Sequence, residues 1–387
     1  MMDLSEKRGP TWNESRDYLD PITLRKTRQI TQFGVYNNTM GYHTGIGWSG
    51  DGENLLLIVG RNDLSALVNC HVPTGDLKQI TDGFRGLTIG SFTVGHTSGI
   101  YLKKHKAVFY HHQESRTARI VDVDSLEEET VANDLDQMGQ VSADESFFLL
   151  METDPEGKPG FNESYERPYR FLKCSLTDGS REVVYEGVGV AGHIQPSPVD
   201  SDLVLFDRNT PLYDYPKFGI TNRTWLLRIS TGELTELAPR NDNHAEWHAT
   251  WRWDGKYIFY HGYSGKRANW VRPCQDGWYV GAIDTSGNVH REYCSPGWTN
   301  YGHVGSLGTT DKILLDGNVT NNMILALSFE DEEKPHFEMV AQHATFWTSN
   351  YGQMCHPHTI SNQDGKYIAF NSFDQNKVGP DVFVVEY

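Results

Sequence analysis

A short motif recurs seven times along the chain and limits its possible folds more than any other feature. Each copy places a tight turn before a short run of apolar, β-branched or aromatic residues, as in Asp51-Gly52 before Leu55–Val59. Asp-Gly turns suit tight hairpins, and runs of this kind form strands. The turns are centred on Asp51, Ser98, Asp144, Asp200, Asp254, Asp311 and Asp364.

The spacing of these turns predicts how the strands are organised. Successive turns lie 46 to 57 residues apart, which is room for about four short strands with their connections. We therefore predict an all-β chain, a seven-bladed β-propeller, in a single domain of residues 1–387; a two-domain β-sandwich is the alternative. A short N-terminal extension (1–18) and an elaborated loop region at about 263–300 would depart from the repeat.

The charge and the cysteine content indicate which kinds of partner and which cell compartment to expect. The net charge of −17 argues against nucleic acid and anionic membranes, which both require basic surfaces. No apolar run reaches the roughly 18 residues of a membrane helix, and no signal sequence is visible. We expect a cytoplasmic protein, or a periplasmic one if a signal was removed, with mostly free thiols and Cys274–Cys294 as the one candidate pair. The oligomeric state stays open.

The densest group of potential ligands is the segment Gln353–His358. In an extended strand His356 and His358 point to the same side, about 6–7 Å apart, and could bind one cation. Gln353 is an odd number of residues from both, so it can join them only if the chain bends. His303 precedes the neighbouring turn at a corresponding position and is a candidate third ligand. The alternative is that these histidines are polar residues at the rim of a blade.

Three further residues could take part in chemistry, and one of them, His248, has a position before its turn similar to those of His303 and His356. His248 precedes the turn at Asp254, Arg223 lies next to Trp225, and His193 stands in a Pro-rich segment. Each also has a structural alternative: a hydrogen-bonded histidine, an ion-paired or stacked arginine, and a rim loop. Glu246 and Asp242 could instead form the carboxylate pair of a glycoside hydrolase, which their unknown separation would decide.

Several of these strings resemble motifs of the oligogalacturonate lyases, seven-bladed propeller enzymes of pectin degradation. The most specific is Gln353-x-x-His356-Pro357-His358, which follows Gln342–Trp347. Further segments that resemble the family are Lys26–Thr31, Gly192–Pro198, Arg223–Leu226 and His248–Trp251. The likeness extends over most of the chain.

The resemblance implies a carbon–oxygen lyase that acts on an anionic uronate oligosaccharide by β-elimination. A base removes the C5 proton, the C4–O bond breaks, and a 4,5-unsaturated uronate remains. The implied cofactor is a divalent cation, most simply Mn²⁺, held by His303, Gln353, His356 and His358. The implied base is His248, with Arg223 as its electrostatic partner, and we expect His193 and Arg208 to contact the substrate.

Two departures from the family pattern leave further functions open. Phe206–Pro211 stands where the family has a Cys-His-Glu-Gly-Pro-like string, and Asn38-Thr39-Met40 stands where a basic pair is expected. The resemblance implies an oligogalacturonate-like substrate, and these differences leave open, as an alternative, a lyase of the same fold that acts on a different uronate oligosaccharide. A non-enzymatic Tol-type binding propeller and a hydrolase that uses Glu246 or Asp242 are two functions of different classes that the sequence also allows.

Overall fold

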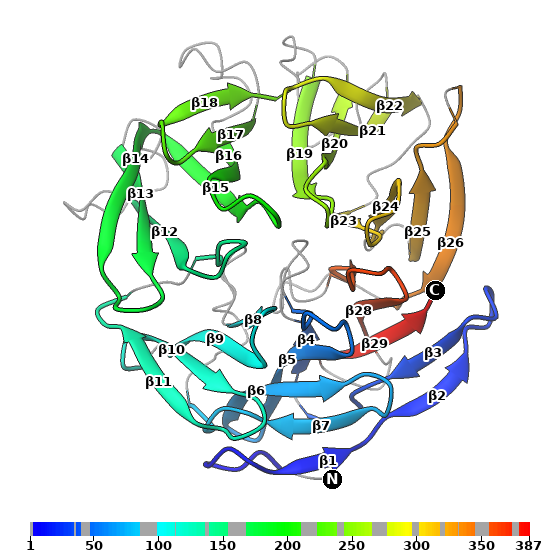
Figure 1. Cartoon of the computed structure of the whole chain (residues 1–387). Coiled ribbons are helices and arrows are strands. Elements are labelled where there is room, and N and C mark those ends of the chain that lie inside the picture. Colours follow the sequence, from blue (N-terminus) through cyan, green and yellow to red (C-terminus); the bar gives the residue numbers. More distant parts are fainter. Residues whose placement is uncertain are drawn as a thin grey trace. The chain divides into compact units, whose positions relative to one another are not determined.

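The computed structural model consists of β-strands and turns (Figure 1). It describes residues 3–387 except 35, 40–46, 86–98, 113, 136–138, 154–167, 210–222, 238–243, 265–276, 296–301, 318–321, 332, 345–355 and 374–378. Within the described residues there is no helix, and so none that is long and apolar enough to cross a membrane. The strands form seven antiparallel sheets, and the predicted seven-bladed β-propeller is confirmed.

The chain divides into two compact units. The first unit contains Met1–Asp136, Tyr301–Ser328 and His336–Tyr387, and the second contains Gln137–Asn300 and Phe329–Pro335. Four sheets belong to the first unit and three to the second.

The four sheets of the first unit include the strands from both ends of the chain. The first consists of β4 (Tyr36–Thr39), β5 (Asn54–Arg61), β6 (Leu64–His71), β7 (Asp76–Gln79) and β1 (Thr11–Asn13). The second consists of β8 (Gly99–Leu102), β9 (Ala107–His112), β10 (Thr117–Asp122) and β11 (Glu128–Ala132). The third consists of β23 (Val304–Ser306), β24 (Lys312–Leu315), β25 (Met323–Ser328) and β26 (His336–Gln342). The fourth consists of β27 (Ile360–Ser361), β28 (Tyr367–Phe373), β29 (Pro380–Glu386), β3 (Lys26–Gln29) and β2 (Arg16–Leu19).

The three sheets of the second unit follow one another along the chain. The first consists of β12 (Phe147–Thr153), β13 (Pro168–Ser175) and β14 (Arg181–Val188). The second consists of β15 (Val190–Pro196), β16 (Leu203–Asn209), β17 (Thr224–Arg228) and β18 (Glu233–Glu236). The third consists of β19 (His244–Trp251), β20 (Tyr257–Ser264), β21 (Gly277–Asp284) and β22 (Val289–Ser295).

Most of the predicted turns join the first two strands of a sheet. Gly255 and Gly365 take positive φ angles of 68° and 76°, which an Asp-Gly hairpin turn requires. The copy predicted at Ser98 is wrong, because β8 already begins at Gly99 and the turn before β9 lies at residues 103–106. That turn has the sequence Lys-Lys-His-Lys, without the Gly or Asp that marks the other copies.

The N-terminal segment takes part in two sheets. Residues 1–18, predicted as an extension, contain β1, which pairs with β7, and most of β2, which pairs with β3. Strand β3 in turn pairs with β29, so that residues from both chain ends share one sheet. These strands are short and polar, and nothing in their composition marks them as strands before the pairing partners are known.

The hydrophobic core consists of layers between successive sheets. In the first unit, Leu56 and Ile58 of β5 pack with Val108 and Tyr110 of β9. In the second unit, residues of β16 and β20, among them Leu205 and Ile258, form a corresponding layer. Within the predicted loop region of residues 263–300, the described part from Gly277 to Ser295 is an antiparallel hairpin of β21 and β22 with a register shift between Ala282 and Ile283.

Candidate functional site

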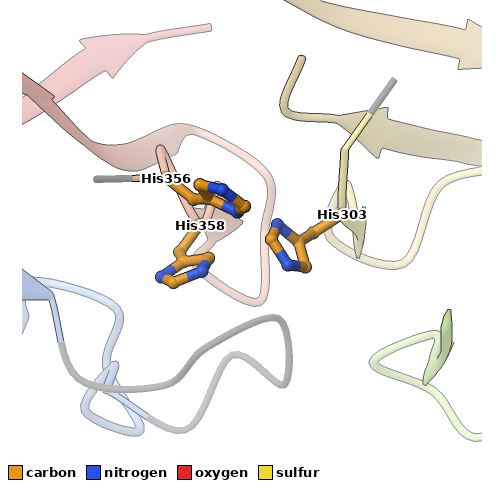
Figure 2. A group of neighbouring side chains, drawn as sticks. All are labelled: His303, His356 and His358. Carbon is orange, nitrogen blue, oxygen red and sulfur yellow. The ribbon is translucent and has the colours of Figure 1, made fainter. Parts of the chain in front are cut away.

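Three buried histidines of the first unit converge on one point. His303 precedes β23, and His356 and His358 precede β27. Each residue offers a nitrogen that lies within 4.8 Å of those of the other two, and their exposed fractions are 3%, 7% and 7%. Figure 2 shows the three rings grouped together from two separate segments of chain. The structure thus brings together three of the four predicted ligands.

The strands that follow these histidines, β23 and β27, are joined by hydrogen bonds. Ser361 Oγ donates to the carbonyl oxygen of Ser306 at 2.7 Å and accepts from the amide of Gly308 at 2.8 Å. His358 has a φ angle of 45°, in the left-handed region that histidine rarely adopts. The hydrogen bonds of Ser361 join the two segments of chain that carry the histidines.

Asp316 is a buried carboxylate that holds two of the three histidines in place. Its Oδ2 accepts from His303 Nδ1 at 3.0 Å and from the His358 amide at 2.9 Å, and its Oδ1 accepts from the His303 amide at 2.6 Å. With its Nδ1 hydrogen donated to a carboxylate, His303 keeps the lone pair of Nε2 for a ligand. This is the usual arrangement behind a metal-binding histidine.

The surroundings of His356 favour its neutral form. Burial, together with the neighbouring His303 and His343, lowers the pKa of His356 to about 4, although Asp316 acts in the opposite direction. At neutral pH its imidazole is therefore uncharged, and one of its two ring nitrogens has a lone pair that can bind a cation. Neutral imidazole is the form that binds metals.

A second polar group lies in the second unit, between β15, β16 and β19. Asp207 Oδ2 lies 2.5 Å from His193 Nδ1 and 2.7 Å from an Arg223 amino nitrogen. A bulge in the pairing of β15 with β16, where His193 has a φ angle of 46°, turns the imidazole towards this carboxylate. The His193 ring also meets the His248 ring edge to face, with 5.6 Å between centroids.

His248 lies on β19, opposite His261 on β20. Nδ1 of His248 is 2.9 Å from Nε2 of His261. Gln195 connects β15 to the same strand: its side chain donates to the carbonyl oxygen of Ala249 at 2.8 Å, and its own carbonyl accepts from Trp251 Nε1 at 3.0 Å. His193, Arg223 and His248 therefore belong to one group of side chains.

Arg208 does not join this group. Successive residues of a strand point to opposite faces, so Arg208 lies on the other side of β16 from Asp207. There its guanidinium stacks on the Trp225 ring, 4.9 Å from the centroid. Gln353, Asp242, Cys274 and the side chains of Glu246 and Cys294 lie outside the described residues. Within the described part, Cys70 and Cys174 are buried free thiols.

Sequence reasoning missed the partners of the histidines: Asp207, His261 and Asp316. Each lies across a hairpin from its histidine, at nearly the same distance from the turn. His248 and His261 are opposite each other about Asp254-Gly255, and the Asp316 amide donates to the His303 carbonyl oxygen across the turn at Asp311. Counting outwards from each turn gives their approximate positions, but the exact partner depends on the strand register.

Comparisons with known proteins support the fold. No protein-family model matches the chain, and no curated protein matches it. Among solved structures it is similar to oligogalacturonate lyase in complex with manganese, at 18% identity, with a TM-score of 0.77 and 98% of each chain covered. The oligogalacturonate lyase of Vibrio parahaemolyticus is 16% identical, with a TM-score of 0.78 and the same coverage. The chain has the fold of these lyases.

The same propeller architecture also occurs with other chemistry. Hydrazine synthase of Kuenenia stuttgartiensis is 12% identical, with a TM-score of 0.57 over 90% of this chain and 97% of its own. A shared fold therefore does not decide the reaction. What the protein does depends on the two groups of side chains described above.

Proposed function

We propose that the protein is a carbon–oxygen lyase that cleaves uronate-containing oligosaccharides by metal-assisted β-elimination. The observation that carries this proposal is the convergence of His303, His356 and His358, with ligand atoms within 4.8 Å of one another. The full-length likeness to a lyase structure that holds manganese supports the same function.

The three imidazoles, with Gln353 as the proposed fourth ligand, would hold the cation. Three imidazole ligands favour a transition metal over Ca²⁺, which prefers oxygen ligands. Ligand type alone does not select Mn²⁺, which we propose from the likeness to the lyase structure that holds manganese. A bound divalent cation would supply a Lewis acid for the uronate carboxylate and stabilise the charge that develops as the C5 proton leaves. Because these ligands are neutral, they would not cancel the positive charge of the cation. That charge would attract an anionic substrate to a chain whose net charge is −17.

The proposed base is His248. Its Nε2 accepts the C5 proton, the C–H electron pair forms the C4–C5 double bond, and the C4–O bond breaks with its oxygen taking up a proton. Arg223 contributes a positive charge whose position is fixed by its 2.7 Å pair with Asp207. His193, held by the same carboxylate, is the proposed substrate contact beside the base; a substrate contact for Arg208 remains a prediction.

One assay distinguishes the lyase from a hydrolase and from a binding propeller. Oligomers of galacturonate, of glucuronate and of sulfated uronates are incubated with the Mn²⁺-loaded protein, and the ultraviolet absorbance of the 4,5-unsaturated uronate is followed. A rise with any of them supports the lyase and identifies the uronate. New reducing ends without a rise in absorbance would indicate a hydrolase, and neither signal would indicate a binding propeller.

A further inference from the structure

The contact between His248 and His261 is an in-plane hydrogen bond. The two rings are almost parallel, with 10° between their planes, and their centroids are 5.2 Å apart. His248 Nδ1 and His261 Nε2 are only 2.9 Å apart. At this centroid distance the nitrogens come so close only if they lie on the line between the ring centres, which is the geometry of an N–H···N bond.

The His261 side of this bond is buried. His261 has an exposed fraction of 2%, and Trp278, at 8%, lies parallel to it with 6.3 Å between ring centroids. Trp278 is on β21, on the far side of β20 from His248. The three rings thus form a row across β19, β20 and β21, and a charge on His261 would be costly at this depth.

An N–H···N bond contains one hydrogen. Which of the two nitrogens carries this hydrogen determines whether Nε2 of His248 can act as a base. If His248 Nδ1 carries the hydrogen, its Nε2 keeps a lone pair that can accept a proton. If His261 Nε2 carries it, His248 Nδ1 is the acceptor and its own hydrogen sits on Nε2, where it blocks a base.

We propose that His261 is a positioning residue that holds His248 in the tautomer with hydrogen on Nδ1. This inference rests on the proposed function and deepens it. In a serine-protease triad an aspartate has this task and also stabilises the imidazolium. Here the carboxylate, Asp207, is paired with His193 and Arg223. A neutral acceptor fixes the tautomer of His248 without adding a negative charge that favours its protonated form.

Two variants of His261 separate the hydrogen bond from packing. His261→Phe keeps an aromatic ring under Trp278 but removes the acceptor, whereas the side-chain oxygen of His261→Gln can still accept from Nδ1–H. We expect His261→Phe to lower kcat by ~100-fold or more with little change in KM, and His261→Gln to stay within ~10-fold of the unmodified protein. Wild-type turnover in a folded His261→Phe variant would overturn the proposal.

The tautomer itself can be measured without substrate. Nitrogen-15 NMR of the imidazoles, with the His248 signals assigned by their loss in His248→Gln, shows which nitrogen carries the hydrogen. We expect Nδ1–H in the unmodified protein and in His261→Gln, and loss of this preference in His261→Phe. His248 with hydrogen on Nε2 in the unmodified protein would overturn the proposal, even in an active enzyme. A protein inactive on every uronate but with Nδ1–H would refute the lyase function and leave the positioning role standing.

Discussion

Single residues that form hydrogen bonds with the histidines determine what the histidines can bind. Asp316 is 1% exposed and accepts three hydrogen bonds, two of them through the same oxygen. A side chain of equal size with an amino group in place of that oxygen would turn an acceptor into a donor. The chemistry of the site therefore depends on an atom that does not itself face a ligand.

The first prediction concerns Asp316→Asn. The NH2 group that takes the place of Oδ2 donates and cannot accept from His303 Nδ1, while the remaining oxygen still accepts from the His303 amide. The substitution therefore favours hydrogen on Nε2, the nitrogen left for a cation. We expect the affinity for Mn²⁺ to fall by ~10- to 100-fold, measured by titration calorimetry. Asp364→Asn, in an exposed turn of the same unit, is the control and should bind as before. Unchanged affinity in Asp316→Asn would show that the carboxylate does not act on the ligands.

The second prediction concerns the proposed base. His248→Ala should lower kcat on the active uronate by ~100- to 10,000-fold, because the C5 proton has no other acceptor. Mn²⁺ affinity should stay the same, since His248 is not one of the three converging histidines. A His248→Ala protein that turns over at the wild-type rate would remove His248 from the mechanism.

At the level of hairpins, the turn sequences account for most of the fold. Each predicted turn other than the one at Ser98 contains Asp, followed by Gly in three of them, and only the turn at 103–106, which contains neither residue, was misplaced. His303, His356 and His358 were predictable because they stand at matching places before successive turns. Asp207 and His261 were not, because a partner is recognisable only once the strand register, bulges included, is known.

The third prediction concerns the sheet that joins both ends of the chain. Asp381 of β29 has no exposed surface and accepts hydrogen bonds from the side chains of Gln29, Thr31 and Asn37. Asp381→Ala would remove the acceptor of three buried donors, of which Asn37 Nδ2 keeps a bond to the Phe33 carbonyl oxygen. It should reduce the free energy of unfolding by about 3 kcal/mol or more in denaturant titrations. Glu386→Ala, at the exposed end of the same strand, should cost less than about 1 kcal/mol. Equal effects would mean that the buried network adds no stability.

Across the whole molecule, the propeller is a scaffold, and the proposed reaction depends on the two groups of side chains described above. A protein with different chemistry shares the architecture at 12% identity. The net charge of −17 would by itself repel an anionic sugar. The proposed function therefore requires a local positive charge, which a cation bound by the histidine group would provide.

The fourth prediction concerns that cation. Mn²⁺ at ~100 times its dissociation constant should stabilise the folded protein by about 2.7 kcal/mol, visible as a higher midpoint of thermal unfolding. Chelator should reverse the shift and stop turnover, and added Mn²⁺ should restore both. His303→Ala should abolish the shift, and Ca²⁺ should not replace Mn²⁺. Full activity in chelator would exclude a metal role.

The pairing of β3 with β29 also has a consequence for biosynthesis. β2 pairs with one edge of β3, but on the other edge Gln29 meets Phe383, so that edge has no partner until β29 has left the ribosome. Closing so long a segment is entropically costly and slow. Until then β3 presents an unpaired edge, the kind of surface at which nascent chains associate with one another. We therefore expect chaperones to bind this N-terminal strand during translation.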